Sequence, residues 1–212
     1  MTSAIERVLV LAPHTDDGEF GCGGSIRRFI REGKELFYAA FSAAPDSVPL
    51  PWSKDILVDE VKEATARLGI KENNMAVYSF KVRELSYHRQ EILEVLVSLK
   101  KIICPDLVFL PSSSDVHQDH STVSIEGIRA FKDTSILGYE LPWNNIEFKT
   151  EAFIILPKED IDAKVHALDA YNSQKGRSYA TEEFIRSLAV TRGVQIGSKY
   201  AEAFEVIRWV MK

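Results

Sequence analysis

Short apolar runs alternate with longer amphipathic stretches along this chain, an arrangement typical of βαβ units and a parallel sheet. Residues 8–12 contain no polar side chain, which is expected of a central strand buried on both faces. The pattern of residues 153–156 predicts a strand at the edge of the sheet, and that of residues 203–210 favours a strand over a helix. Further strands are predicted at residues 36–41, 75–78, 107–110 and 136–140.

Helical stretches occupy most of the intervals between these strands. In residues 55–68 the apolar side chains recur at helical spacing, and Gly69 marks the end of that helix. A glycine-rich segment, residues 21–25, is predicted to be a turn that leads into a helix at residues 26–32, with Gly33 after its end. Further helices are predicted at residues 90–103, 122–131, 158–171 and 182–191. We therefore predict an α/β fold with a mainly parallel sheet, in one domain over residues 1–212 with a C-terminal extension.

The composition narrows the class of protein and its location. Hydrophobic residues make up 45% of the 212 residues and charged residues 27%, as in ordinary globular proteins. The net charge of −5 argues against a nucleic-acid-binding protein, which usually carries a basic face. No apolar stretch reaches the ~18 residues of a membrane span, and the first residues lack the basic region of a signal peptide. Cys22 and Cys104 form neither a Cys-x-x-Cys site nor a disulfide framework, so we expect a reducing, cytoplasmic location.

Two polar segments follow predicted strands, at the places where a parallel sheet binds its ligands. The first segment, residues 14–19, comes directly after the first strand, and the second, residues 115–120, comes after the strand at 107–110. In an open parallel sheet, ligands bind outside the carboxyl ends of the strands. Both segments contain histidine and aspartate, so we expect the two segments to share one site.

The spacing of these side chains predicts a metal site. His14 and Asp17 are three residues apart, as are His117 and His120, so on a helical turn each pair would share a face. A catalytic zinc takes three protein ligands and keeps one position for water, and imidazole and carboxylate suit zinc or another divalent metal. Of the adjacent pair Asp16 and Asp17, one carboxylate can bind the metal while the other takes a proton from the water.

Each segment taken alone has a simpler interpretation. An Asp-Asp pair after a strand is often a solvated turn or a helix cap, and His-x-x-His is common on surfaces. Because both segments follow strands of the same predicted sheet, and no set of thiolates competes for a metal, a joint metal site is the better interpretation. Asp119, next to His120, is predicted to orient an imidazole ligand from behind.

Three stretches of the chain resemble one known family. Residues 12–24 are similar to the opening His-Pro-Asp-Asp signature of the LmbE-like (PIG-L) N-deacetylases, and residues 117–120 are similar to their second motif, usually His-Pro-Asp-His. A third similarity lies in residues 171–174, 192–193 and 200–204. The three stretches stand in the family's order and extend over nearly the whole chain.

The resemblance implies a fold, a reaction and a role for each residue of the site. The fold would be a Rossmann-like three-layer αβα arrangement, and the enzyme would use zinc to remove acetyl or other acyl groups from small amino sugars and their conjugates. By resemblance, His14, Asp17 and His120 would bind the metal and Asp16 would be the general base. His117 would stabilise the oxyanion or protonate the leaving amine. Family members often assemble, so a homo-oligomer is a further expectation.

The chain departs from the family pattern at several positions. Thr15 and Gln118 replace the two prolines of the motifs, and Gly18 stands where many members carry glutamate. Asp115 and its neighbour stand where some members place a tyrosine that helps to hold the oxyanion, so that role is unassigned. Lys54 lies in the region where many members have a substrate-binding arginine and is a candidate to replace it, although a solvated lysine is the better interpretation.

Aromatic and basic side chains in predicted loops are candidates for substrate binding. Sugars stack on aromatic faces, and arginine binds anionic groups such as a nucleotide phosphate. The aromatic candidates to wall a sugar pocket are Trp52, Trp143, Tyr139 and Tyr179, and by their loop positions Trp52 and Trp143 are better candidates than Tyr179. Arg177 and Arg192 are the basic candidates.

Two other functions remain open at this point. The first is metal-dependent hydrolysis of a non-sugar amide or an ester. The second is a sugar- or nucleotide-binding module that has kept the fold and lost catalysis. The complete His and Asp set argues against the binding module, and the choice of substrate depends on loop residues that match no motif.

Overall fold

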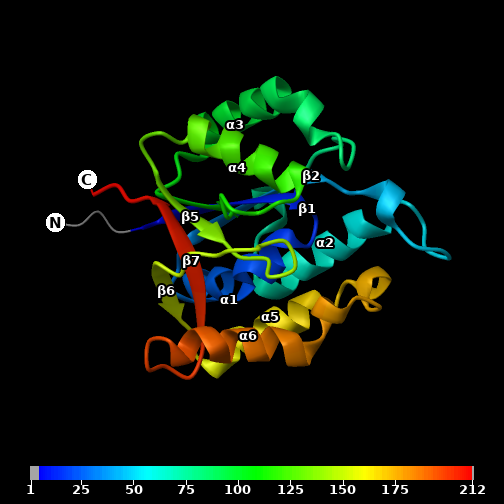
Figure 1. Ribbon diagram of the computed structural model, residues 1–212. Coiled ribbons are helices and arrows are strands. Elements are labelled where there is room, and N and C mark those ends of the chain that lie inside the picture. Colours follow the sequence, from blue (N-terminus) through cyan, green and yellow to red (C-terminus); the bar gives the residue numbers. More distant parts are fainter. Residues whose placement is uncertain (1–4, 212) are drawn as a thin grey trace.

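A seven-stranded sheet forms the centre of the computed structural model, which describes residues 5–211 (Figure 1). The first four residues, on which the expectation of no signal peptide partly rests, lie outside the described part. The strands are β1 (Arg7–His14), β2 (Glu35–Ser42), β3 (Met75–Val77), β4 (Leu107–Pro111), β5 (Ser135–Tyr139), β6 (Ala152–Ile155) and β7 (Ala201–Arg208). Their order in the sheet is β3-β2-β1-β4-β5-β7-β6, and all neighbours are parallel except β7, which is antiparallel to both β5 and β6.

Helices cover both faces of this sheet and confirm the predicted three-layer fold (Figure 1). One face carries α3 (Arg89–Ile103) and α4 (Gln118–Ala130). The other face carries α1 (Asp17–Arg31), α2 (Ile56–Leu68), α5 (Lys158–Leu168) and α6 (Glu182–Val194). None of the helices in the described residues combines the length and the apolar character needed to cross a bilayer.

Strand β1 supplies both halves of the core, which explains its unbroken apolar sequence. Val8 and Val10 are fully buried in the core cluster shared with α1 and α2. Leu9 and Leu11 are fully buried in the cluster shared with α3 and α4. Because successive side chains of a strand point to opposite faces, a strand between two helical layers must be apolar at every position.

The order of the strands reverses between β1 and β4, and this reversal determines where the site lies. From β1 the chain builds outward to β2 and β3 on one side, and then returns to add β4 and β5 on the other side. Val8 pairs with Leu107 and Val10 with Phe109 in parallel register. The carboxyl ends of β1 and β4 therefore lie side by side, where doubly wound sheets bind ligands.

The glycine-rich segment, residues 21–25, is not a turn. It is part of α1, whose regular backbone is interrupted only at Cys22 (φ −144°, ψ 24°). A Cβ atom on Gly21 would lie 2.2 Å from the Tyr139 ring, so the absence of a side chain lets α1 approach the sheet closely. Gly33 follows the end of α1 with φ +80°, as expected for the residue after a helix.

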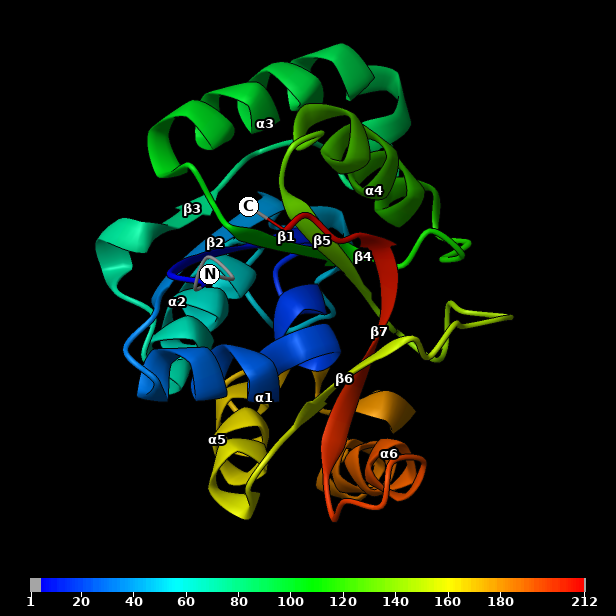
Figure 2. The ribbon, with the colours of Figure 1, turned by 90° about the vertical axis from the view of Figure 1, so that its left-hand side faces the viewer.

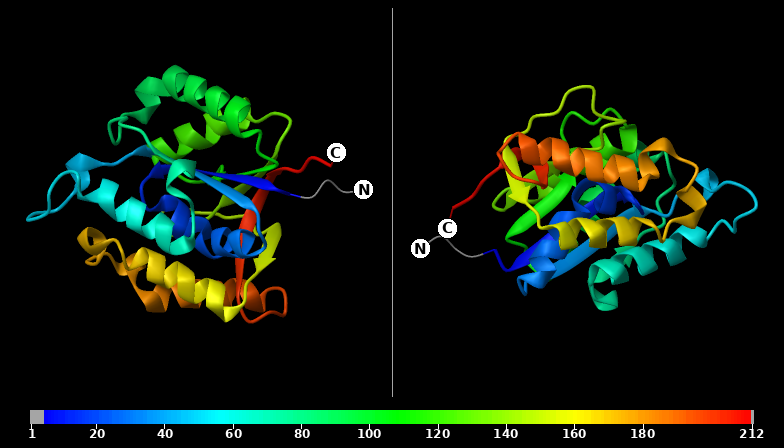
Figure 3. Two further views of the ribbon diagram at one scale, coloured as in Figure 1. Left: turned by 180° about the vertical axis from the view of Figure 1, so that it is seen from behind. Right: turned by 90° about the horizontal axis from the view of Figure 1, so that it is seen from below.

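The last third of the chain belongs to the sheet and is not an extension of it. Strand β7 lies between β5 and β6, and β6 is the edge strand that the sequence predicts. Helix α5 packs against α1 and α2, whereas α6 packs against β7 (Figures 2 and 3). This arrangement brings the loop between α5 and α6 back to the carboxyl ends of the first strands.

The close approach of α1 to the sheet predicts a cost for Gly21→Ala. In an exposed helix this change would stabilise the protein. Here the added methyl group must displace the Tyr139 ring, so the free energy of unfolding should fall by about 1–3 kcal/mol, as for other overpacked cores. Urea denaturation measures the change. At Gly176 a Cβ meets nothing within 4 Å, so Gly176→Ala is the control and should cost no stability. Equal stability of Gly21→Ala and the wild type would contradict the packing argument.

Candidate active site

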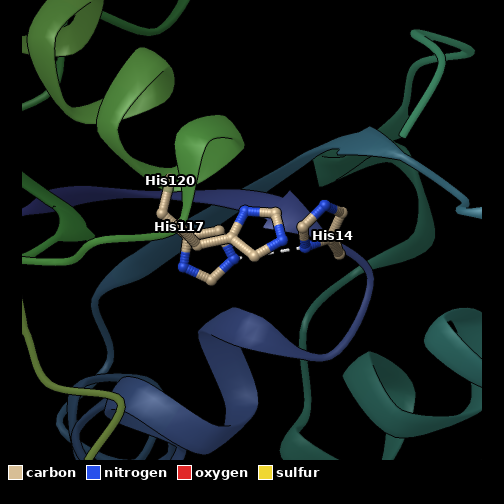
Figure 4. Close-up of side chains that lie close together, drawn as sticks. All are labelled: His14, His117 and His120. Carbon is tan, nitrogen blue, oxygen red and sulfur yellow. Dashed lines mark hydrogen bonds between the residues drawn. The ribbon is translucent and has the colours of Figure 1, made fainter. Parts of the chain in front are cut away.

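A cavity of about 520 Å³ opens at the carboxyl ends of β1 and β4. The lining includes every histidine and aspartate that the two motifs assign to ligation or catalysis: His14, Asp16, Asp17, His117 and His120. His14 ends β1, Asp17 begins α1, and His120 lies in the first turn of α4. Figure 4 shows the imidazoles converging from β1 and from the start of α4.

Three donor atoms in this cavity have the spacing of a metal site. Nδ1 of His14 lies 3.2 Å from Oδ2 of Asp17, and Nε2 of His120 lies 3.3 Å from the same oxygen. The two imidazole nitrogens are 3.2 Å apart. Ligands of a tetrahedral zinc at bond lengths of 2.0–2.1 Å are separated by about 3.3 Å. The residues present therefore fit a divalent metal with two nitrogen ligands and one oxygen ligand.

Buried carboxylates hold both imidazoles from behind. Nε2 of His14 lies 2.9 Å from Asp119, and Nδ1 of His120 lies 2.8 Å from Asp115. Asp119 is fully buried, and it also accepts the backbone N–H of Arg83 at 2.6 Å. With a proton on the nitrogen that faces each carboxylate, the lone pair of the other nitrogen faces Asp17, as metal ligation requires.

Asp119, which we predict to orient an imidazole ligand, lies against His14. The partner of His120 is Asp115, to which no role is assigned from the sequence. One signal in the sequence could have identified Asp115: it is a carboxylate in the segment between β4 and α4, two residues before His117.

His117 differs from the other two histidines in its backbone and in its hydrogen bonds. It is not on a helical turn with His120, because α4 begins at Gln118 and His117 caps it with extended backbone angles (φ −71°, ψ 126°). Nδ1 of His117 accepts the backbone N–H of Asp119 at 3.2 Å. In the neutral ring, Nε2 then carries the proton and is a hydrogen-bond donor.

His14, His117 and His120 form a second set of groups that could hold a metal, with donor atoms within 4.8 Å of one another. We favour the set with Asp17. Its donor atoms lie closer together, and Nε2 of a neutral His117 has no free lone pair. Burial lowers the pKa of His117, and the neighbouring His120 lowers it further, so the ring is neutral at pH 7.

The charges of the site favour a cation between the two ligating imidazoles. Burial lowers the pKa of both rings, but carboxylates outweigh it. Asp17 and Asp119 raise the pKa of His14 to about 9, and Asp17 and Asp115 raise that of His120 to about 10. Burial opposes ionisation of Asp17, yet the two histidines hold its pKa well below the usual range. The field that favours a proton on each ring also favours a divalent cation in its place.

Asp16 lies next to this centre and makes no capping hydrogen bond to α1. Burial and the neighbouring Asp17 raise the pKa of Asp16 to about 6. A carboxylate with this pKa is ionised at pH 7 and is still basic enough to accept a proton. Arg177 acts in the opposite direction and favours the ionised form.

Aromatic and basic side chains form the wall of the cavity. Trp143 stacks on Tyr179 with ring centroids 3.9 Å apart and an angle of 12° between the planes. Nε of Arg177 donates to Gln174 at 2.6 Å, and its guanidinium lies 5.8 Å from the centre of the Tyr179 ring. Of these, Trp143 and Arg177 are predicted substrate-binding residues, whereas Gln174 was not expected to contribute.

The structure does not bring the other substrate-binding candidates into this cavity. Trp52 does not line it, and the side chain of Lys54 is 77% exposed and pairs with Asp46 at 3.8 Å. Tyr139 is fully buried, because its side of β5 faces α1, so the prediction that it walls a pocket is wrong. Arg192 forms two hydrogen bonds with Glu140 and is also absent from the lining.

Comparison with known proteins yields matches over most of the chain. The family model described as PIG-L: GlcNAc-PI de-N-acetylase matches residues 9–131. Uncharacterized deacetylase YaiS of Escherichia coli (strain K12) is 25% identical over 182 residues, which are 82% of this chain and 95% of that protein.

Two solved structures share the fold. N,N'-diacetylchitobiose deacetylase from Pyrococcus horikoshii has a TM-score of 0.80 at 22% identity, covering 96% of this chain and 84% of that one. A 4-carboxy-2-hydroxymuconate hydratase from Pseudomonas putida KT2440 has a TM-score of 0.81 at 17% identity, covering 98% of each chain. Since these two proteins differ in reaction, the fold alone does not select the chemistry.

The hydrogen bond between His120 and Asp115 predicts the effect of Asp115→Asn on metal binding. The amide keeps the shape of the side chain but loses the negative charge behind the ligand. The affinity for zinc should fall about 10- to 100-fold, as for other partners of metal ligands. Competition with a chromophoric chelator measures it. Asp46→Asn is the control: it removes the same charge from the lining of the cavity, but the ion pair of Asp46 is with Lys54 and not with a histidine of the site. Unchanged affinity of Asp115→Asn would refute the assigned role.

Proposed function

This chain belongs to the PIG-L family of GlcNAc-PI de-N-acetylases, and from that membership we propose that it is a zinc-dependent hydrolase. Its reaction would be the removal of an N-acetyl, or another N-acyl, group from an amino sugar or sugar conjugate. The observation that carries the proposal is the set of three metal donors, His14, Asp17 and His120, directly beside the unligated carboxylate of Asp16.

The chain's own residues provide a base and a donor for amide hydrolysis. A divalent metal held by His14, Asp17 and His120 would polarise the scissile carbonyl and make the attacking water more acidic. Asp16 accepts the proton of that water as it attacks the acyl carbon. His117 donates a hydrogen bond from its Nε2–H to the oxygen that becomes negative. When the carbon–nitrogen bond breaks, the amine leaves with the proton that Asp16 took from the water, because a neutral His117 has no second proton to give.

The cavity wall is suited to a sugar with an anionic substituent. Trp143, next to Tyr179, offers an aromatic face to a sugar ring, and Arg177 offers a guanidinium to a carboxylate or phosphate. The name of the Pyrococcus relative gives an acetylated amino sugar as its substrate, which supports the same class of substrate here.

The organisation of the chain is also part of the proposal. We infer that residues 1–212 form one domain, because a single sheet takes strands from the first and last parts of the described chain. The cytoplasmic location and the homo-oligomer stay predictions.

Amine release by the purified protein tests this function. The wild type, loaded with zinc, should release a primary amine from N-acetylglucosamine conjugates, and a chelator should abolish the release. In Asp16→Asn the base is lost, so kcat should fall about 10²- to 10⁴-fold. Zinc content, measured by mass spectrometry, should stay the same, because Asp16 is not among the three donors.

Three results would contradict parts of this proposal. Turnover like that of the wild type in Asp16→Asn would remove Asp16 from its role. Release from non-sugar amides or esters alone would favour the alternative hydrolase. A wild type without bound zinc and without amine release would favour the binding module.

A further inference from the structure

Glu19 is a fully buried carboxyl group close to the site, and the reaction described above does not use it. It lies in the first turn of α1, two residues after Asp17. The hydrogen bonds to its side chain come from two phenol groups. Tyr38 of β2 contacts Oε2, and Tyr171, which precedes the short turn at Asn172–Gln174, contacts Oε1 at 2.9 Å.

The same two phenol groups also contact the backbone next to the general base. The hydroxyl of Tyr38 lies 2.9 Å from the carbonyl oxygen of Thr15, and that of Tyr171 lies 2.7 Å from the same oxygen. The peptide bond between Thr15 and Asp16 is therefore held by a middle strand of the sheet and by the last third of the chain. Thr15, Glu19 and both tyrosines are buried, so water does not compete for these contacts.

The number of available hydrogens links Glu19 to the contacts with Thr15. There are four oxygen–oxygen contacts, two from each hydroxyl, but the two tyrosines supply only one hydrogen each. The two hydroxyls therefore divide their hydrogens between Thr15 and Glu19, and a hydrogen donated from the side chain of residue 19 to one tyrosine would leave that tyrosine free to donate to Thr15.

Gly18 makes room for this arrangement. A Cβ atom at this position would lie 2.6 Å from Cε2 of Tyr38 and 2.8 Å from its hydroxyl oxygen. A side chain here would push Tyr38 away from both Thr15 and Glu19. The replacement of glutamate by glycine at residue 18, a departure from the common family pattern, thus has a structural reason in this chain.

We propose that Glu19, Tyr38 and Tyr171 form a clamp on the Thr15 carbonyl, and that this clamp positions the carboxylate of Asp16. The inference rests on the proposed function, in which Asp16 is the base. These three are positioning residues, since they act through the backbone of Thr15. A displacement of about 1 Å at a reacting group can cost about 100-fold in rate, so loss of the clamp should reduce kcat.

The variant Tyr38→Phe/Tyr171→Phe tests the clamp by removing both hydroxyls and leaving the rings. We expect kcat to fall roughly 10- to 100-fold, with KM and zinc content close to those of the wild type. Glu19→Gln, whose amide can donate to one tyrosine, should keep most of the activity, and Glu19→Leu should lose as much as the double variant. The matched control is Tyr139→Phe, which removes a buried hydroxyl that donates to a β1 carbonyl, Leu11, at 3.0 Å and does not contact Thr15.

Hydrogen exchange of residues 14–20 reports on the clamp independently of turnover. In the double variant this segment should exchange at least about tenfold faster, whereas β4 should be unchanged. If the wild type releases no amine, the proposed function fails and the exchange result alone decides the clamp. Wild-type exchange in the double variant would overturn the inference. So would wild-type kcat in that variant, or an equal loss of kcat in Tyr139→Phe.

Discussion

The geometry of the site depends on one buried oxygen atom, Oδ2 of Asp17. It accepts the backbone N–H of His14 at 2.8 Å and faces the ring nitrogens of His14 and His120 at 3.2 and 3.3 Å. A buried carboxylate is costly unless positive charge and hydrogen bonds surround it. The end of β1 and the starts of α1 and α4 must therefore meet at this point. The parallel neighbours β1 and β4, where the order of the strands reverses, bring them together.

The carboxylate of Asp17 is surrounded first by two imidazoles and then by two further carboxylates. The imidazoles of His14 and His120 contact it directly, and Asp119 and Asp115 stand behind them. The last third of the chain closes the site, because Tyr171 holds the backbone before the base and Arg177 and Tyr179 form the wall. The residues of the two short motifs are thus held in place by the sheet, by the first turns of α1 and α4, and by the loop after α5.

Much of this arrangement could be predicted, and the reasons for the exceptions are physical. Continuous apolar runs predict the buried strands. Because ligands of a parallel sheet bind at the carboxyl ends of its strands, the sequence also predicts that the two polar segments share one site. The resemblance to the family is confirmed. The partners of the histidines could not be assigned from sequence, since Asp115 and Asp119 are close together and the start of α4 at Gln118 decides which ring each one reaches. The segment at residues 21–25 has the composition of a turn, but its glycines serve the contact between α1 and Tyr139. Tyr139 and Tyr179 differ in burial because of tertiary packing, which local patterns do not report.

Anomalous diffraction from zinc-loaded crystals tests the central claim about the ligand set most directly. The account predicts one ion at about 2.0–2.2 Å from Nδ1 of His14, Oδ2 of Asp17 and Nε2 of His120, with His117 outside the coordination sphere. An ion bound by His14, His117 and His120, with the Asp17 carboxylate not coordinated, would contradict it.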